Sequence, residues 1–225
     1  QTRRFGPFNP DAIEFIARHG MNRSVYAPKD DPFLRRLWRE PHDPASLAVV
    51  GELVTACHDR GVDFVYCISP GLTVRYSGDD DFQALLRRYA DVAALGVRRV
   101  GLLLDDIPGS LQHDADRAEF GGLIEAQAHL IERVRAALPP GTELMICPTR
   151  YFGYGDEPEI TAFGRAVADD VVITFTGRQI CSTTIDLDDA RRFEAATAHR
   201  PVYWDNYPVN DVAMTGQLHI GPYRG

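Results

Sequence analysis

Short apolar segments alternate with longer helix-like segments along the chain, and this alternation restricts the fold more than any other feature. It predicts parallel strands joined by crossover helices, because a parallel neighbour is reached only through a long connection over the sheet face. Strands that are apolar along their whole length are covered on both faces. We expect strands at residues 24–27, 62–68, 99–104, 144–147, 171–175 and 202–204, and helices at 11–19, 44–60, 80–95, 116–138 and 187–198.

Helix start and stop signals support these boundaries. Asp43 and Pro44 form a typical helix start, and Gly20, Gly61 and Gly96 each follow the last turn of an expected helix. No Gly-x-Gly-x-x-Gly motif follows the first strand, which disfavours a dinucleotide-binding sheet. The remaining α/β candidate is a TIM-type (β/α)8 barrel, as a single catalytic domain over residues 1–225. A closed barrel has eight strands in about 250 residues, so we expect this barrel to be incomplete at its first and last strands.

The composition excludes several classes of partner. The chain has 225 residues, 44% of them hydrophobic, and a net charge of −8 without a run of basic residues. Nucleic acid and anionic membranes attract clustered Lys and Arg, so neither is expected as a partner. No apolar stretch approaches the roughly 20 residues that span a bilayer.

The four cysteines indicate a reducing compartment. Cys57, Cys67, Cys147 and Cys181 lie far apart and form no Cys-x-x-Cys pair, which favours free buried thiols over a zinc or redox motif. The first residues have no apolar core of a signal peptide. We therefore expect a cytoplasmic setting, although a chain numbered from Gln1 is also compatible with a leader removed earlier.

Polar and aromatic residues directly follow each expected strand. In (β/α) barrels the chemistry collects beyond the carboxyl ends of the strands, so these residues are candidates for one shared site. The segments are 26–31 (YAPKDD), 68–72 (ISPGL), 105–108 (DDIP), 147–153 (CPTRYFG), 175–178 (FTGR) and 203–211 (YWDNYPVND).

Asp105 and Asp106 are the strongest catalytic candidates, because they follow four residues that are suited to a buried strand. Adjacent residues point to opposite sides unless the backbone turns, which disfavours an ordinary acid and nucleophile pair about 5 Å apart. Two separate roles fit better. Repulsion between neighbouring carboxylates raises the pKa of one, which then serves as general acid, while the other accepts a hydrogen bond from substrate.

Other interpretations of the pair remain open. It could form a helix N-cap with a solvated neighbour, or half of a magnesium site. A metal would need further carboxylates at strand ends, and only Asp30, Asp31 and Asp211 are available. We expect no metal and no cofactor, and a metal-dependent hydrolase stays as a minor alternative that a chelator would expose.

Five further residues could bind a sugar. Lys29 could bond a hydroxyl or simply be a surface lysine, while Tyr151 and Trp204 could line a pocket or belong to the core. Asn206 and Asp211 could bind hydroxyls or be turn residues. The seven histidines show no ligand spacing and receive no role.

Taken in order, many short blocks resemble the catalytic domain of the O-GlcNAcase family, glycoside hydrolase family 84. The resemblance runs from about Gly20 to the end of the chain. Because the blocks share the order and spacing of the family, they are more specific than the Asp pair alone. They are residues 21–22, 26–31, 38–40, 64–72, 104–107, 147–149 with Tyr151, 176–177, 204–206, 210–211 and 221–223.

The resemblance implies a retaining β-N-acetylglucosaminidase in which the 2-acetamido oxygen of the substrate attacks the anomeric carbon and forms an oxazoline. It implies that Asp105 orients the acetamido N–H, and that Asp106 protonates the leaving oxygen and later deprotonates water. Tyr151 would contact the acetamide, and Trp204 would line the pocket for its methyl group. Lys29, Asn206 and Asp211 would bind the sugar. The implied partner is a terminal β-linked GlcNAc, as on Ser or Thr of modified proteins.

The chain departs from the family at both ends. Arg3 stands where the family has a sugar-binding glycine, and the sequence ends at Gly225, before the eighth strand and its asparagine. We weigh three explanations: a chain cut at both ends, a homodimer whose partner replaces the missing strands, and a degenerate relative. The last gives the alternative function, a catalytically silent GlcNAc-binding protein that lacks part of the barrel.

Overall fold

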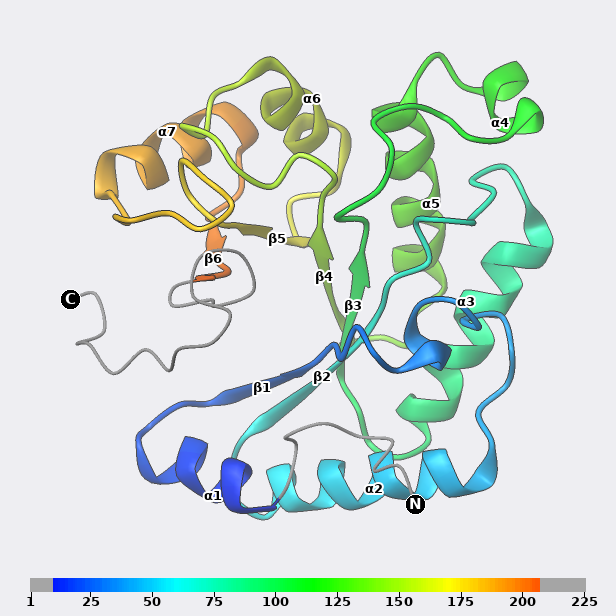
Figure 1. Ribbon diagram of the computed structural model, residues 1–225, viewed down its shortest axis with the longest axis vertical. Helices are drawn as coiled ribbons and strands as arrows, with labels where there is room; N and C mark the ends of the chain where they lie inside the picture. Colours follow the sequence, from blue (N-terminus) through cyan, green and yellow to red (C-terminus); the bar gives the residue numbers. More distant parts are fainter. Residues whose placement is uncertain (1–9, 207–225) are drawn as a thin grey trace.

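The computed structural model describes residues 10–206, which form a curled sheet of six parallel strands in the order β1-β2-β3-β4-β5-β6 (Figure 1). The strands are β1 (Arg23–Tyr26), β2 (Asp63–Ile68), β3 (Arg99–Leu103), β4 (Glu143–Cys147), β5 (Val172–Phe175) and β6 (Val202–Tyr203). The helices are α1 (Pro10–Arg18), η1 (Pro32–Leu34), α2 (Pro44–His58), α3 (Asp79–Ala93), α4 (Asp114–Glu119), α5 (Leu123–Ala137), α6 (Pro158–Ala166) and α7 (Leu187–Thr197).

This architecture confirms the predicted α/β fold as a half-barrel. All five strand pairs are parallel, and Figure 1 shows the helices around the outside of the curved sheet. The strands have two buried faces: in β2, Tyr66 and Ile68 belong to the large helix-facing core, while Val65 and Cys67 belong to a smaller cluster on the opposite face. Two buried faces explain why the strands are apolar without alternation.

Ion pairs at the amino ends of the strands reflect the curvature. Arg23 on β1 pairs with Glu143 on β4 at 2.8 Å, although these strands are not neighbours in the sheet. Arg99 on β3 pairs with Asp63 on β2 at 3.0 Å. The sheet must therefore curl far enough to bring β1 opposite β4. Among the described strands β1 and β6 are the edges, and association into a homodimer at such edges stays a prediction.

The turn signals in the sequence are confirmed. Gly20, Gly61 and Gly96 have φ of 72°, 66° and 94°, in the left-handed region that glycine adopts without a steric penalty. The Asp43 side chain accepts a hydrogen bond from the Ser46 N–H at the start of α2.

Two expectations about helices are wrong. Residues 116–138 do not form one helix, because the chain breaks into α4 and α5 at Gly121 and Gly122, where glycine weakens a continuous helix. Helix α6 was not expected, although Pro158 at its first turn and the buried Ile160 and Phe163 form a helical signal. Helix α4 follows the loop after β3 and helix α6 follows the loop after β4, and both loops lie at the carboxyl face of the sheet, which carries the candidate site.

The loop after β2 depends on a buried carboxylate. The Asp81 side chain has no exposed surface and accepts hydrogen bonds from Arg39 Nε at 2.6 Å and from the Arg75 backbone N–H at 2.7 Å. Burial opposes ionisation of Asp81, but the bonds from Arg39 and Arg75 outweigh it and lower its pKa. A carboxyl with a lowered pKa in the folded state stabilises the protein above its unfolded pKa, and this contribution is lost as the pH falls.

Replacing Asp81 with asparagine should lower the free energy of unfolding at pH 7 by about 3 kcal/mol, because it breaks a buried charge pair. Urea unfolding at pH 7 and at progressively lower pH measures this, and the difference between the two proteins should shrink as the pH falls. As control, Asp114→Asn removes an exposed carboxylate paired with Arg117 and should change stability by less than about 1 kcal/mol. A pH-independent difference for Asp81→Asn would contradict the ion-pair argument.

Candidate active site

The acidic pair lies where β3 ends, and the backbone turns between its members. Asp106 has a φ of 54°, an unusual value for a residue other than glycine. The turn brings both carboxylates to Lys29, whose Nζ lies 3.2 Å from Asp105 Oδ2 and forms a closer ion pair with Asp106 Oδ2. Lys29 belongs to the loop after β1, so the half-barrel brings the ends of β1 and β3 together across its concave face.

Tyr151, from the loop after β4, adds a hydrogen-bond donor to the pair. Its hydroxyl donates to Asp106 Oδ1 at 3.3 Å. Burial and the charges of Asp106 and Asp105 raise the pKa of Tyr151, so the hydroxyl keeps its proton at neutral pH. The Thr176 N–H holds the Tyr151 carbonyl at 2.9 Å, which fixes this loop to the end of β5.

The electrostatics of the pair differ from the sequence expectation at Asp106. The hydrogen bond from Lys29 lowers the pKa of Asp106 and outweighs the effect of its partial burial. Burial on its own would lower the pKa of Lys29, but its bonds to Asp106 and Asp105 raise it instead. The raised pKa expected for one member is therefore wrong for Asp106 in the absence of substrate, because the neighbouring ammonium outweighs the repulsion between the carboxylates.

These side chains line a cavity of about 350 Å³ at the carboxyl ends of the strands. It is large enough for a small-molecule ligand. Six of the seven predicted site residues line it: Lys29, Asp105, Asp106, Tyr151, Trp204 and Asn206. The seventh, Asp211, lies outside the described residues. The other lining residues are Ala27, Leu103, Cys147, Thr176, Ile180 and Cys181.

Trp204 and Asn206 form the wall of this cavity beyond β6. The Trp204 backbone N–H donates to the Phe175 carbonyl at 2.9 Å, and the Asn206 side chain donates to the Ile180 carbonyl at 2.9 Å. Ile180 and Cys181 were not predicted as site residues, because they lie within the loop after β5 and not at a strand end. Their apolar character in a loop otherwise rich in polar residues is the only signal in the sequence.

Free thiols also lie near the site. Cys57, Cys67 and Cys147 are buried and unpaired, as predicted, whereas Cys181 is half-buried. Burial raises the pKa of Cys147 to about 12, with a further contribution from Asp105, so this thiol stays protonated beside the acidic pair.

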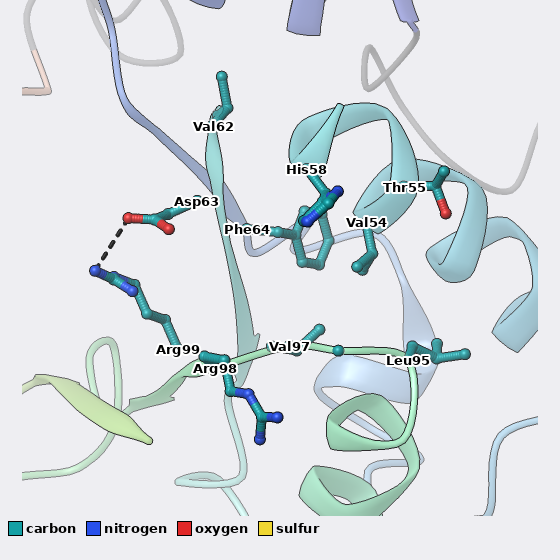
Figure 2. A pocket seen from close by; sticks show the side chains of 11 residues that line it. Val54, Thr55, His58, Val62, Asp63, Phe64, Leu95, Val97, Arg98 and Arg99 are labelled. Carbon is teal, nitrogen blue, oxygen red and sulfur yellow. Dashed lines mark ion pairs between the residues drawn. The ribbon is translucent and has the colours of Figure 1, made fainter. Parts of the chain in front are cut away.

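A second cavity, of about 380 Å³, lies at the opposite, amino end of β2 and β3 (Figure 2). Its one lining carboxylate is Asp63, which Figure 2 shows paired with Arg99. His58 and Arg98 also line this cavity, and Figure 2 shows them well apart from each other. This cavity holds no pair of carboxylates, whereas the cavity at the carboxyl face holds Asp105 and Asp106 in contact with Lys29.

Within residues 10–206 no cluster of three or more His, Cys, Asp or Glu side chains could hold a metal ion. Around the acidic pair, Lys29 and Tyr151 are donors, and Asp105 and Asp106 are acceptors. Such a set can accept a hydrogen bond from a substrate amide and exchange a proton with a substrate oxygen.

A model of the beta-N-acetylglucosaminidase family matches residues 10–225 of this sequence. The chain belongs to this family. Protein O-GlcNAcases of Rattus norvegicus and Mus musculus are each 28% identical to this β-N-acetylglucosaminidase homologue over 211 residues, which cover 91% of this chain and 23% of the relative. A solved mutant of the Thermobaculum terrenum O-GlcNAc hydrolase has a TM-score of 0.92 and 32% identity, and the match covers 96% of this chain and 47% of that one.

Family membership confirms the resemblance drawn from the sequence blocks, and it makes the chain a homologue of glycoside hydrolases. The β-N-acetylglucosaminidase homologue spans about a quarter of the length of these curated relatives and about half of the solved hydrolase. In residues 10–206, no helix has the length and apolar character needed to cross a bilayer.

Proposed function

We propose that this chain is a retaining β-N-acetylglucosaminidase that hydrolyses terminal β-linked GlcNAc, as on Ser or Thr, with the help of the substrate's own 2-acetamido group. The observation that carries the proposal is the convergence of Asp105, Asp106 and Tyr151 on one cavity of about 350 Å³ in a member of this family. Residues 1–225 would act as one catalytic domain, and the unpaired buried thiols agree with a reducing compartment such as the cytoplasm.

In the first step the acetamido oxygen attacks the anomeric carbon while the bond to the leaving oxygen breaks. Asp105, with only 15% of its side chain exposed, is suited to accept a hydrogen bond from the acetamido N–H and to stabilise its growing positive charge. Asp106, with 44% exposed, is suited to give its proton to the leaving oxygen. The product of this step is a bicyclic oxazoline that is protonated at nitrogen, with its N–H held by the Asp105 carboxylate.

In the second step water attacks the anomeric carbon, the acetamido oxygen leaves, and Asp106 takes the proton of the water. Two displacements at one carbon give overall retention. Tyr151 donates to Asp106 in the free chain, and its hydroxyl is close enough to the pair to bond the reacting acetamide. Trp204 would contact the acetamide methyl group, while Lys29, Asn206 and Asp211 would bind sugar hydroxyls.

The contact with Lys29 opposes protonation of Asp106, because it lowers the pKa of that carboxyl. A substrate hydroxyl that bonds Lys29 would release the carboxyl. Lys29 would then hold the pair in its ionised form without substrate and bind the sugar with substrate.

Replacing Lys29 with methionine should shift the pH profile. The value of kcat/KM follows the free enzyme, and it falls as the pH rises through the pKa of an essential acid. Removing the ammonium raises the Asp106 pKa, so the alkaline limb should move to higher pH even though the maximum falls with the lost sugar contact. Initial rates on an aryl β-GlcNAc, from the lowest pH at which the chain stays folded up to pH 9, measure the limb, because the Asp106 pKa of the free chain lies below its usual range. If the alkaline limb of the variant lay at the same pH as in the parent, or at a lower pH, the contact between Lys29 and Asp106 would not exist in solution.

Turnover of an aryl β-GlcNAc tests the function directly, with the aryl β-glucoside as control. We expect release of the aryl group from the first substrate only, and NMR of the first product should show the β-anomer. Activity should survive a chelator, whereas its loss would indicate a metal-dependent hydrolase. An α-anomer would contradict the retaining mechanism.

The second candidate is a catalytically silent GlcNAc-binding protein. The observation that favours it is the lowered pKa of Asp106, which disfavours the proton that a general acid needs. Calorimetric titration with GlcNAc separates the two candidates. Binding without turnover of the aryl glycoside would support the silent protein, and turnover would exclude it.

A further inference from the structure

A chain of hydrogen bonds links the outer helix α5 to the residue before the acidic pair. Gln127 on α5 is 1% exposed, and its Nε2 donates to Thr149 Oγ1 at 2.8 Å. The Thr149 hydroxyl in turn donates to the Leu104 carbonyl at 2.8 Å. Because the Thr149 oxygen accepts from Gln127, its own proton is directed to Leu104. Leu104 immediately precedes Asp105, so the chain of bonds ends at the start of the catalytic turn.

The turn itself needs such support. Asp106 has a φ of 54°, and a residue other than glycine in this region costs about 1 kcal/mol or more unless its surroundings hold it there. The Leu104 N–H is fixed to the Cys147 carbonyl of β4 at 2.8 Å, and the Leu104 carbonyl is fixed to Thr149. Both polar groups of Leu104 are therefore tied to β4 and its following loop, and the backbone must turn beyond this point.

We propose that Gln127 and Thr149 are positioning residues, which hold the Leu104 carbonyl so that Asp105 and Asp106 both face the cavity. The inference rests on the proposed function, because it concerns the residues assigned there to the reaction. Neither residue lines the catalytic cavity. Both line a separate cavity of about 300 Å³ outside the sheet, next to Phe163.

The placement of Gln127 argues for a positioning role over plain core packing. Its amide lies among buried apolar side chains of α5, where a polar group that loses its partner costs free energy. Replacing both partners of a buried hydrogen bond with apolar groups of the same shape is nearly neutral for stability. An apolar pair would therefore remove the bond between Gln127 and Thr149 at little cost, but it would leave the buried Leu104 carbonyl without the proton of Thr149.

A double-mutant cycle with Thr149→Val and Gln127→Leu separates the two roles. We expect Thr149→Val to lower kcat about 10- to 100-fold with little change in KM, because small misplacement of catalytic groups is costly. Thr149→Ser should restore kcat. The double variant should regain in urea unfolding only the part of the stability that the bond between Gln127 and Thr149 accounts for, and it should not regain kcat. As a matched control, Thr197→Val removes a buried hydroxyl that donates to the Phe193 carbonyl in α7, and its kcat should equal that of the parent.

An NMR titration of the Asp106 carboxyl tests the same positioning role and does not depend on turnover. In the parent Asp106 faces Lys29, Tyr151, Asp105 and, at longer range, Arg35. In Thr149→Val the carboxyl should lose part of its contact with Lys29, and its pKa should rise. An inactive parent would count against the proposed function alone, because the titration still tests the positioning role. A variant that keeps both the parent's kcat and the parent's Asp106 titration would overturn that role.

Discussion

Replacing Asp106 with alanine is expected to lower kcat on an aryl β-GlcNAc with a poor leaving group by about 10³-fold, the range of a lost general acid. The loss should be much smaller for an aryl group that leaves readily, because such an oxygen needs little protonation as its bond to the sugar breaks. The Asp106 carboxyl is suited to this role, since it is the more exposed member of the pair and receives the hydroxyl of Tyr151. Steady-state rates across a series of aryl leaving groups measure the dependence.

Azide sharpens this test. In Asp106→Ala the second step also loses its base, and a small anion that needs no deprotonation can replace water as nucleophile. Added azide should therefore raise the rate on the substrate with the good leaving group and yield a β-glycosyl azide. As control, Asp156→Ala removes an exposed carboxylate from the loop after β4 that does not line the cavity, and its rates should match the parent. An equal loss for every leaving group would contradict the acid role of Asp106.

The sequence predicts the central strands β2 to β5 well because they are buried along nearly their whole length. The segments 62–68, apolar apart from Asp63, and 144–147 predict buried strands, and β2 and β4 begin and end within one residue of them. The site follows from the same topology. Parallel strands bring their carboxyl ends to one edge, so the polar residues after β1, β3, β4 and β6 line one cavity.

Features set by contacts across the barrel could not be predicted. Lys29 and Asp106 are 77 residues apart, and nothing local shows that their contact lowers the Asp106 pKa. The turn at Asp106 cannot be predicted either, because an aspartate rarely adopts a positive φ. The hydrogen bond that supports the turn comes from Thr149, which is distant in the sequence. Helix α6 is not predicted, because its nine residues follow a polar segment that is typical of the end of a strand.

Replacing Asp105 with asparagine should lower kcat by about 10²- to 10³-fold, the cost of losing one well-placed electrostatic contact in the transition state. Asparagine keeps the shape of the side chain and can still accept a hydrogen bond from the acetamido N–H. The loss in kcat therefore measures the contribution of the negative charge of Asp105. The Asp105 side chain is 15% exposed and lies 3.2 Å from Lys29, so its charge acts in a partly desolvated site.

The dependence on the leaving group distinguishes Asp105 from Asp106. Because Asp105 assists the attacking acetamide and not the departing oxygen, its loss should be similar for good and poor leaving groups. Azide should not restore the rate, since the defect lies in forming the oxazoline and not in its breakdown. Rates for both variants on the same aryl series give this comparison. If the loss in Asp105→Asn grew with the pKa of the leaving group while that in Asp106→Ala did not, the two roles would have to be exchanged. The fold of the site would then stand, with the deeper carboxylate acting as the acid.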